Sequence, residues 1–193
     1  MACNLKNVLS NANECKESPA GLSNYMMVLP LANIATISVD DAHNRYLITG
    51  PQNGGLKGFR IDFKNQTGQV TSEANSMGAG WSHTGTGRVE MNEDDMALVS
   101  RTLHNMDKYI CLFPTGNVLE GGAEWKVVGN QFGECEWAVA ADSGASRGDD
   151  HGQTFTVTCG YQVYPVMKFI GNVAQATDQE FTDDTGDTQT YSE

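Results

Sequence analysis

A run of strict alternation in the last quarter of the chain constrains its fold more than any other feature. Apolar residues occupy every second position of a nine-residue stretch: Phe155, Val157, Cys159, Tyr161 and Val163. Thr154, Thr156 and Thr158 alternate with the first of these residues, and threonine favours extended backbone. Because side chains of a strand point alternately to its two faces, the segment predicts a long strand with one buried and one polar face.

Shorter runs of the same kind fill much of the remaining chain, separated by glycine, asparagine and aspartate. Clear strand patterns cover residues 59–63, 81–91, 109–113 and 135–139, and weaker ones cover 25–29, 34–39, 46–49, 69–74 and 125–128. One segment, 93–104, has helical spacing instead, with Met96, Val99 and Leu103 on one face and Asn92 as N-cap. The sequence therefore predicts a mostly β fold, an antiparallel β-sandwich or barrel with one flanking α-helix.

Three segments lack the pattern of a packed core. Residues 1–24 are polar and are expected to form an extended N-terminal arm, and residues 40–57 place a short apolar triplet between turn clusters, which predicts a projecting loop or hairpin. Residues 170–193 contain six acidic residues and no lysine or arginine, which predicts an acidic C-terminal tail. One domain is therefore expected over residues 25–169.

Charge limits the classes of partner. The chain carries 24 acidic and 12 basic residues, a net charge of −12, which argues against sequence-independent binding of nucleic acid and against anionic membranes. No apolar run approaches the roughly 20 residues that span a bilayer, and the first residues lack a signal-peptide pattern. A protein without a membrane partner, made in the cytoplasm, is expected.

The cysteines indicate no metal or redox motif. They lie at positions 3, 15, 111, 135 and 159, an odd number without a Cys-x-x-Cys pair. Cys111, Cys135 and Cys159 fall on the apolar phase of predicted strands and are expected to pack as reduced thiols. Cys3 and Cys15 could form a disulfide, and the sequence leaves their state open.

No residue pattern indicates catalysis. The four histidines are far apart, and His83 lies on the apolar phase of a strand, which favours a core or interface side chain over a metal ligand. Ser143, between Asp142 and Gly144, resembles a protease nucleophile turn, but no histidine and carboxylate accompany it in a recognisable pattern. An ordinary loop is the favoured interpretation there, and no catalytic, cofactor or metal residue is assigned.

The order of these elements resembles that of the tail tube (major tail) proteins of long-tailed bacteriophages. The features that carry the resemblance are stretches 59–64, 69–73, 80–91, the acidic-capped helix 93–104, 107–113, 125–129, 142–144, 152–159 and 164–168. The N-terminal end, from Ala2 to Ser18 and then from Ala20 to Tyr25, is similar to versions from phages of gut Bacteroidetes. The resemblance spans most of residues 1–169.

This resemblance implies a structural protein of the virion tail, assembled in the host bacterial cytoplasm. Such proteins form rings, usually of six, that stack into a hollow tube, a negatively charged conduit through which DNA passes without specific binding. Copies of itself and other tail and neck proteins are the implied partners. The candidate inter-subunit contacts are Leu5, Val8, Tyr46, Leu47, Ile48, Leu56, Trp81 and His83.

Three other functions stay open at this stage. A related ring protein of the same particle, such as a head–tail connector, a tail terminator or a neck or barrel ring, is the nearest alternative. A hydrolase that uses Ser143 and a secreted adhesin module are less favoured. Polymerisation distinguishes a tube subunit from a ring protein that stops at one ring.

Overall fold

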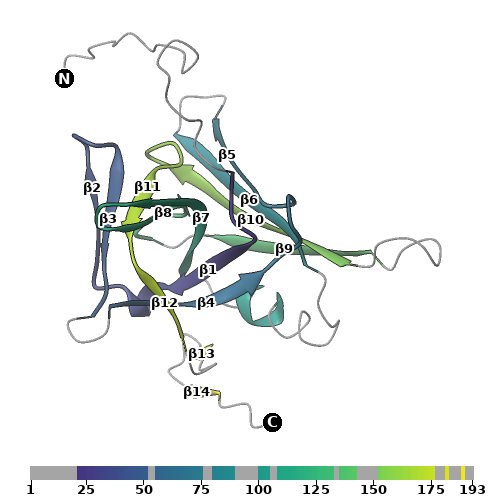
Figure 1. Ribbon diagram of the computed structural model, residues 1–193. Helices are drawn as coiled ribbons and strands as arrows, with labels where there is room; N and C mark the ends of the chain where they lie inside the picture. The colour runs from purple at the N-terminus through teal and green to yellow at the C-terminus, as the bar shows by residue number, and fades with distance from the viewer. Residues whose placement is uncertain are drawn as a thin grey trace.

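Two β-sheets form the body of the protein in the computed structural model (Figure 1). The structure describes residues 21–51, 55–75, 80–89, 100–104, 108–132, 135–142, 152–176, 181–182 and 188–189. The mostly β fold of two sheets that the sequence predicts is confirmed. Residues 100–104 are α-helical, and the start of the predicted helix, with Met96 and Val99, lies outside the described residues.

The larger sheet has eight strands in the order β12-β4-β1-β7-β8-β11-β3-β2. Its strands, in chain order, are β1 (Tyr25–Pro30), β2 (Thr36–Asp40), β3 (Arg45–Thr49), β4 (Leu56–Asp62), β7 (Tyr109–Leu119), β8 (Gly122–Val128), β11 (Lys168–Gly171) and β12 (Val173–Gln175). A short 3-10 turn, η2 (Leu31–Asn33), follows β1. Neighbouring strands are antiparallel except for β11 beside β3 and β12 beside β4.

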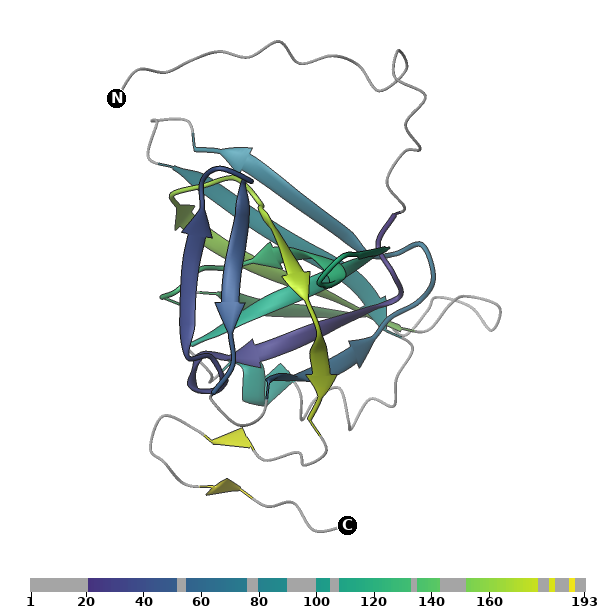
Figure 2. The ribbon, with the colours of Figure 1, turned by 60° about the vertical axis from the view of Figure 1, so that its left-hand side comes forward.

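The smaller sheet has four antiparallel strands in the order β5-β6-β10-β9. They are β5 (Gln69–Ala74), β6 (Trp81–Val89), β10 (Gly152–Gln162) and β9 (Glu136–Asp142). A separate two-stranded ribbon, β13 (Phe181–Thr182) with β14 (Thr188–Gln189), lies near the C-terminus (Figure 2).

One hydrophobic core lies between the two sheets. The alternating residues of β10 fill its centre, and Phe155 stacks on Trp137 of β9 at a ring-centroid distance of 5.0 Å. Leu103 of the helical segment is also buried in this core. The phase predicted for the first half of β10 is therefore confirmed.

A second core lies on the opposite face of the larger sheet, because strands β3 and β11 at one end and β4 at the other contribute side chains to it. Its buried members are Met27, Leu29, Tyr46, Ile48, Leu56, Ile110, Leu112, Trp125, Val127, Met167 and Phe169. β7 therefore has apolar side chains on both faces, as its continuous run of buried residues requires.

The predicted segment boundaries need three corrections. Residues 40–57 contain β3, which forms a hairpin with β2, and the start of β4. The expected hairpin is present, but three residues of the segment are buried in the second core, so the segment belongs to the domain. The sheet continues past residue 169 through β11 and β12, so the tail begins later than predicted. At the other end, Leu22 packs on the first core and the Ser23 amide donates to the Pro114 carbonyl, so residues 21–24 belong to the domain.

Candidate functional site

The smaller sheet presents one polar face away from the core. On β6 and β10 this face consists mainly of hydroxyl-bearing side chains that pair across the strands, Thr84 with Thr158 and Thr86 with Thr156. Exposed Ala138 and Ala140 continue it on β9. Its charged residues are few, namely Glu73, Arg88 and Glu136. The described part of this face is therefore hydrophilic and consists mainly of small side chains.

Both edges of this sheet are open as far as the described residues go. Within the described part of the chain, β5 pairs only with β6, and β9 pairs only with β10. Neither strand contains proline or lysine, two residues that commonly protect edge strands from pairing with other chains. Two strands therefore offer unpaired backbone groups on opposite sides of one sheet.

A pocket of about 500 Å³ lies at one end of the sheet. The end of β5, the start of β6 and the end of β10 form it, through Ala74, Asn75, Gly80, Trp81, Tyr161, Gln162 and Val163. Trp81 pairs with Ala74 on one side and with Gln162 on the other, so the three residues lie in one row across the strands.

A β-bulge at the end of β10 creates this pocket and reverses the predicted phase of two residues. The pairing with β6 shifts between Cys159 and Gln162, and Tyr161 has a positive φ of 56°. Tyr161 is 80% exposed and Val163 is 73% exposed, while Gln162 points inward. The prediction that both apolar residues face the core is therefore wrong, because the extra residue shifts the alternation by one position.

Gln162 and His83 are buried polar residues next to this pocket. The Gln162 amide nitrogen donates to the Gly160 carbonyl at 2.9 Å, and its Oε1 has no partner in the structure. His83 is bonded through Nε2 to the Tyr164 carbonyl at 2.8 Å, and its Nδ1 is likewise unpaired. Burial lowers the pKa of His83, and the bond to the Tyr164 carbonyl opposes this shift only in part.

This lowered pKa predicts a loss of stability in mild acid. His83 stays neutral in the folded chain, whereas the unfolded chain binds a proton at this residue as the pH falls below about 6.5. Proton binding stabilises the unfolded state, so the free energy of unfolding falls with the pH. In urea titrations between pH 7.5 and 5, we expect His83→Gln, which keeps a donor for Tyr164, to show a smaller decline than the wild type. An equal decline in both proteins would assign the pH dependence to other groups.

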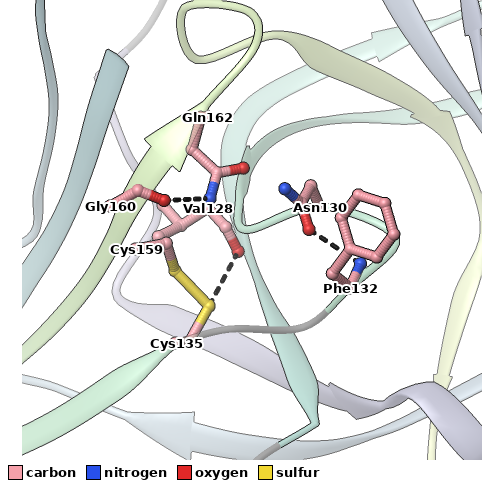
Figure 3. The surroundings of a disulfide bond; sticks show 7 residues. All are labelled: Val128, Asn130, Phe132, Cys135, Cys159, Gly160 and Gln162. Carbon is pink, nitrogen blue, oxygen red and sulfur yellow. Dashed lines mark hydrogen bonds between the residues drawn. A yellow bond between two sulfur atoms is a disulfide. The ribbon is translucent and has the colours of Figure 1, made fainter. Parts of the chain in front are cut away.

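Cys135 and Cys159 form a disulfide between the start of β9 and the centre of β10 (Figure 3). The prediction of reduced thiols at these two positions is therefore wrong. Alternation correctly places both sulfurs inside, but it carries no information on which strands are neighbours. Cys111 is a free, buried thiol whose pKa is raised by burial, as predicted for a cysteine that packs as an apolar side chain.

The predicted contact residues fall into three groups. Tyr46, Ile48, Leu56 and His83 are buried within the chain, and this burial does not favour the predicted contact of their side chains with neighbouring copies. Leu47 is 43% exposed on the outer face of β3, and Trp81 is partly exposed in the pocket. Leu5 and Val8 lie outside the described residues.

Sequence reasoning missed three exposed apolar residues at the pocket end of the smaller sheet: Phe132, Tyr161 and Val163. Phe132 follows β8 and precedes β9, where its amide donates to Asn130 Oδ1 at 2.7 Å. Its isolated position in a polar stretch was a usable signal, because such a residue has no strand phase that would bury it.

The described residues contain neither a cluster of possible metal ligands nor a helix that could span a membrane. No three histidine, cysteine or acidic side chains gather there where they could hold a metal ion. None of the described helical segments is long and apolar enough to cross a bilayer. Comparison with protein-family models, with curated proteins and with solved structures finds no match to this chain.

Proposed function

We propose that this chain is a structural subunit of a bacteriophage tail tube, which assembles into rings that stack into a conduit for the genome. One observation carries the proposal: the four-stranded sheet has one face in the core, a polar opposite face and two open edges. The order of elements along the sequence, which resembles that of tail tube proteins, supports the same function.

The strand directions suit ring closure. The four strands alternate in direction, so β5 and β9 run opposite ways at the two edges. A rotation about an axis along the strands preserves these directions, so β5 of one copy meets β9 of the next in antiparallel orientation. Such a head-to-tail contact closes into a ring when the rotation is a whole fraction of a turn.

The polar face suits the lumen of such a tube. Threonine and serine hydroxyls bind water and carry no charge, so this face offers a phosphate backbone few attractive contacts. The net charge of −12 adds repulsion. DNA would therefore pass without specific binding, and the partners of the chain would be copies of itself and other tail and neck proteins of the virion, assembled in the host bacterial cytoplasm.

Charge placement at the two edges tests the proposal. Thr71 of β5 and Ala138 of β9 lie on the polar face, and two strands separate them within one chain. In Thr71→Glu/Ala138→Glu, every junction between copies would bring like charges together, whereas Thr71→Lys/Ala138→Glu would bring opposite charges together. We expect the first variant to remain monomeric and the second to assemble as the wild type does.

Negative-stain electron microscopy and the mass distribution in solution give the readout. Long tubes from the wild type and from the opposite-charge variant support the proposal, provided that both variants unfold at similar temperatures. Single rings that never lengthen would instead favour a connector, terminator or neck ring of the same particle. Equal assembly of the two variants would show that β5 and β9 do not meet, and a wild type that stays monomeric at high concentration would contradict self-assembly.

A further inference from the structure

We infer that Phe132 of one copy inserts into the pocket between β5, β6 and β10 of the next copy. The inference rests on the proposed ring and names the residues that hold its junctions together. It starts from two complementary features of one chain, an exposed aromatic side chain that precedes β9 and an open pocket formed by β5, β6 and β10.

The pocket is a suitable receptor for an aromatic ring. Its volume of about 500 Å³ exceeds that of a phenylalanine side chain, and Trp81, Tyr161 and Val163 give it apolar walls. Tyr161 and Val163 are largely exposed in the single chain, so a ring seated between them would remove apolar surface from water on both partners. An exposed patch of this kind is typical of a protein–protein contact.

The Phe132 side chain is suited to fill this pocket. Its side chain is 60% exposed, and its backbone amide is bonded to Asn130, which fixes the turn in which it lies. The residue comes shortly before β9, whose first residues belong to the same end of the sheet as Gln162 (Figure 3). Phe132 and the pocket therefore lie at the same end of the smaller sheet, but Phe132 lies beside the edge strand β9 and the pocket lies beside the edge strand β5.

Strand direction brings the two features together. The pocket lies at the C-terminal end of β5, and Phe132 lies just before the N-terminal end of β9. When β5 of one copy pairs antiparallel with β9 of the next, the C-terminal end of the first strand faces the N-terminal end of the second. Phe132 of the second copy then arrives beside Ala74 and Asn75, at the mouth of the pocket.

The polar groups at this contact are compatible with a second copy of the chain. Among the described residues that line the pocket none is charged, so two chains that each carry −12 meet there without direct repulsion from these side chains. Because two different surfaces of the chain meet, a contact of this type is heterologous, as a ring requires.

Cysteine cross-linking tests the contact directly. In a background with Cys3→Ser and Cys15→Ser, one protein carries Phe132→Cys and the other carries Val163→Cys. On mixing and oxidation with oxidised glutathione, we expect a covalent dimer from the mixture and at most a trace from either protein alone. The matched control replaces Phe132→Cys by Val118→Cys, because Val118 is also exposed, at 82%, but lies near the C-terminal end of β7 in the larger sheet.

A second variant measures the strength of the contact. Phe132→Ala removes an exposed ring, so the thermal midpoint of the monomer should be unchanged, while the protein concentration needed for assembly should rise about tenfold or more. Val118→Ala should leave that concentration as it is.

The outcomes separate this inference from the proposed function. Tubes that form without a cross-link above the Val118→Cys level, and that tolerate Phe132→Ala, would overturn the inference and leave the tube. A specific cross-link from a protein that forms neither rings nor tubes at any concentration would support the contact and contradict the tube.

Discussion

The variant Gly85→Val is expected to lose at least about 3 kcal/mol of folding free energy, a large part of the stability of a domain of this size. Gly85 lies on the core face of β6, where a Cβ atom would come within 2.7 Å of the Phe113 ring. Phe113 is fully buried on β7 of the opposite sheet, so its ring cannot turn aside into solvent. A valine would therefore force the two sheets apart, and urea unfolding followed by circular dichroism would record the loss.

A matched glycine in the same sheet provides the control. Gly160 of β10 has no atom within 4 Å of the position that a Cβ would take, so Gly160→Ala should change the free energy of unfolding by no more than about 0.5 kcal/mol. In addition, shortening the opposing ring with Phe113→Leu should return part of the stability lost in Gly85→Ala. If Gly85→Val and Gly160→Ala were equally stable, the close contact between the sheets would be contradicted.

Gly85 also shows how far the sequence determines the fold. Alternation in β6 predicted a strand, and the structure confirms it, because strand periodicity depends only on local backbone geometry. The sequence could not show that the rings of Phe113 and Phe155 occupy the space above Gly85 and Gly87. That packing is set by residues distant along the chain and on different strands, which a local pattern does not pair.

The candidate site was less predictable than the strands, for a related reason. The β-bulge at Tyr161 adds one residue to β10, and a single extra residue exchanges the buried and exposed faces from that point on. The hydrophobicity of Tyr161 and Val163 was therefore read as burial, while the structure exposes both. For residues 40–57 the error has the opposite sign, because a segment expected to project from the domain buries three side chains. Three apolar residues are enough for a strand near the end of a sheet, where neighbouring strands supply the rest of the core.

The disulfide leads to the second large expected effect. Cys135 and Cys159 are 24 residues apart. A cross-link that closes a loop of this length lowers the entropy of the unfolded chain and thereby raises its free energy by about 3 kcal/mol at 25 °C. We expect Cys135→Ala/Cys159→Ala to lose about that much folding free energy in urea titrations. Wild type that has been unfolded, reduced and refolded with dithiothreitol present should lose a similar amount.

Cys111 separates the effect of the bond from the effect of the sulfur atoms. Cys111→Ala also removes a buried sulfur from the first core, so it should cost some packing energy, but its stability should depend on dithiothreitol as strongly as that of the wild type. In Cys135→Ala/Cys159→Ala that dependence should disappear. A wild type with equal midpoints in both redox states, and with the same number of alkylated thiols in urea, would show that the bond does not form.

The position of the bond gives this test a consequence for assembly. Cys159 lies in the central strand β10, and Cys135 lies at the start of β9, the edge strand that would meet the next copy. Without the bond, the start of β9 is held by its pairing with β10 and by Trp137 packed on Phe155, and an edge strand has no second neighbour to stop it from fraying. We therefore expect reduced protein, even where it remains folded, to need a higher concentration to assemble than oxidised protein. Equal assembly in both redox states, with the stability difference still present, would show that the bond stabilises the subunit without ordering its edge.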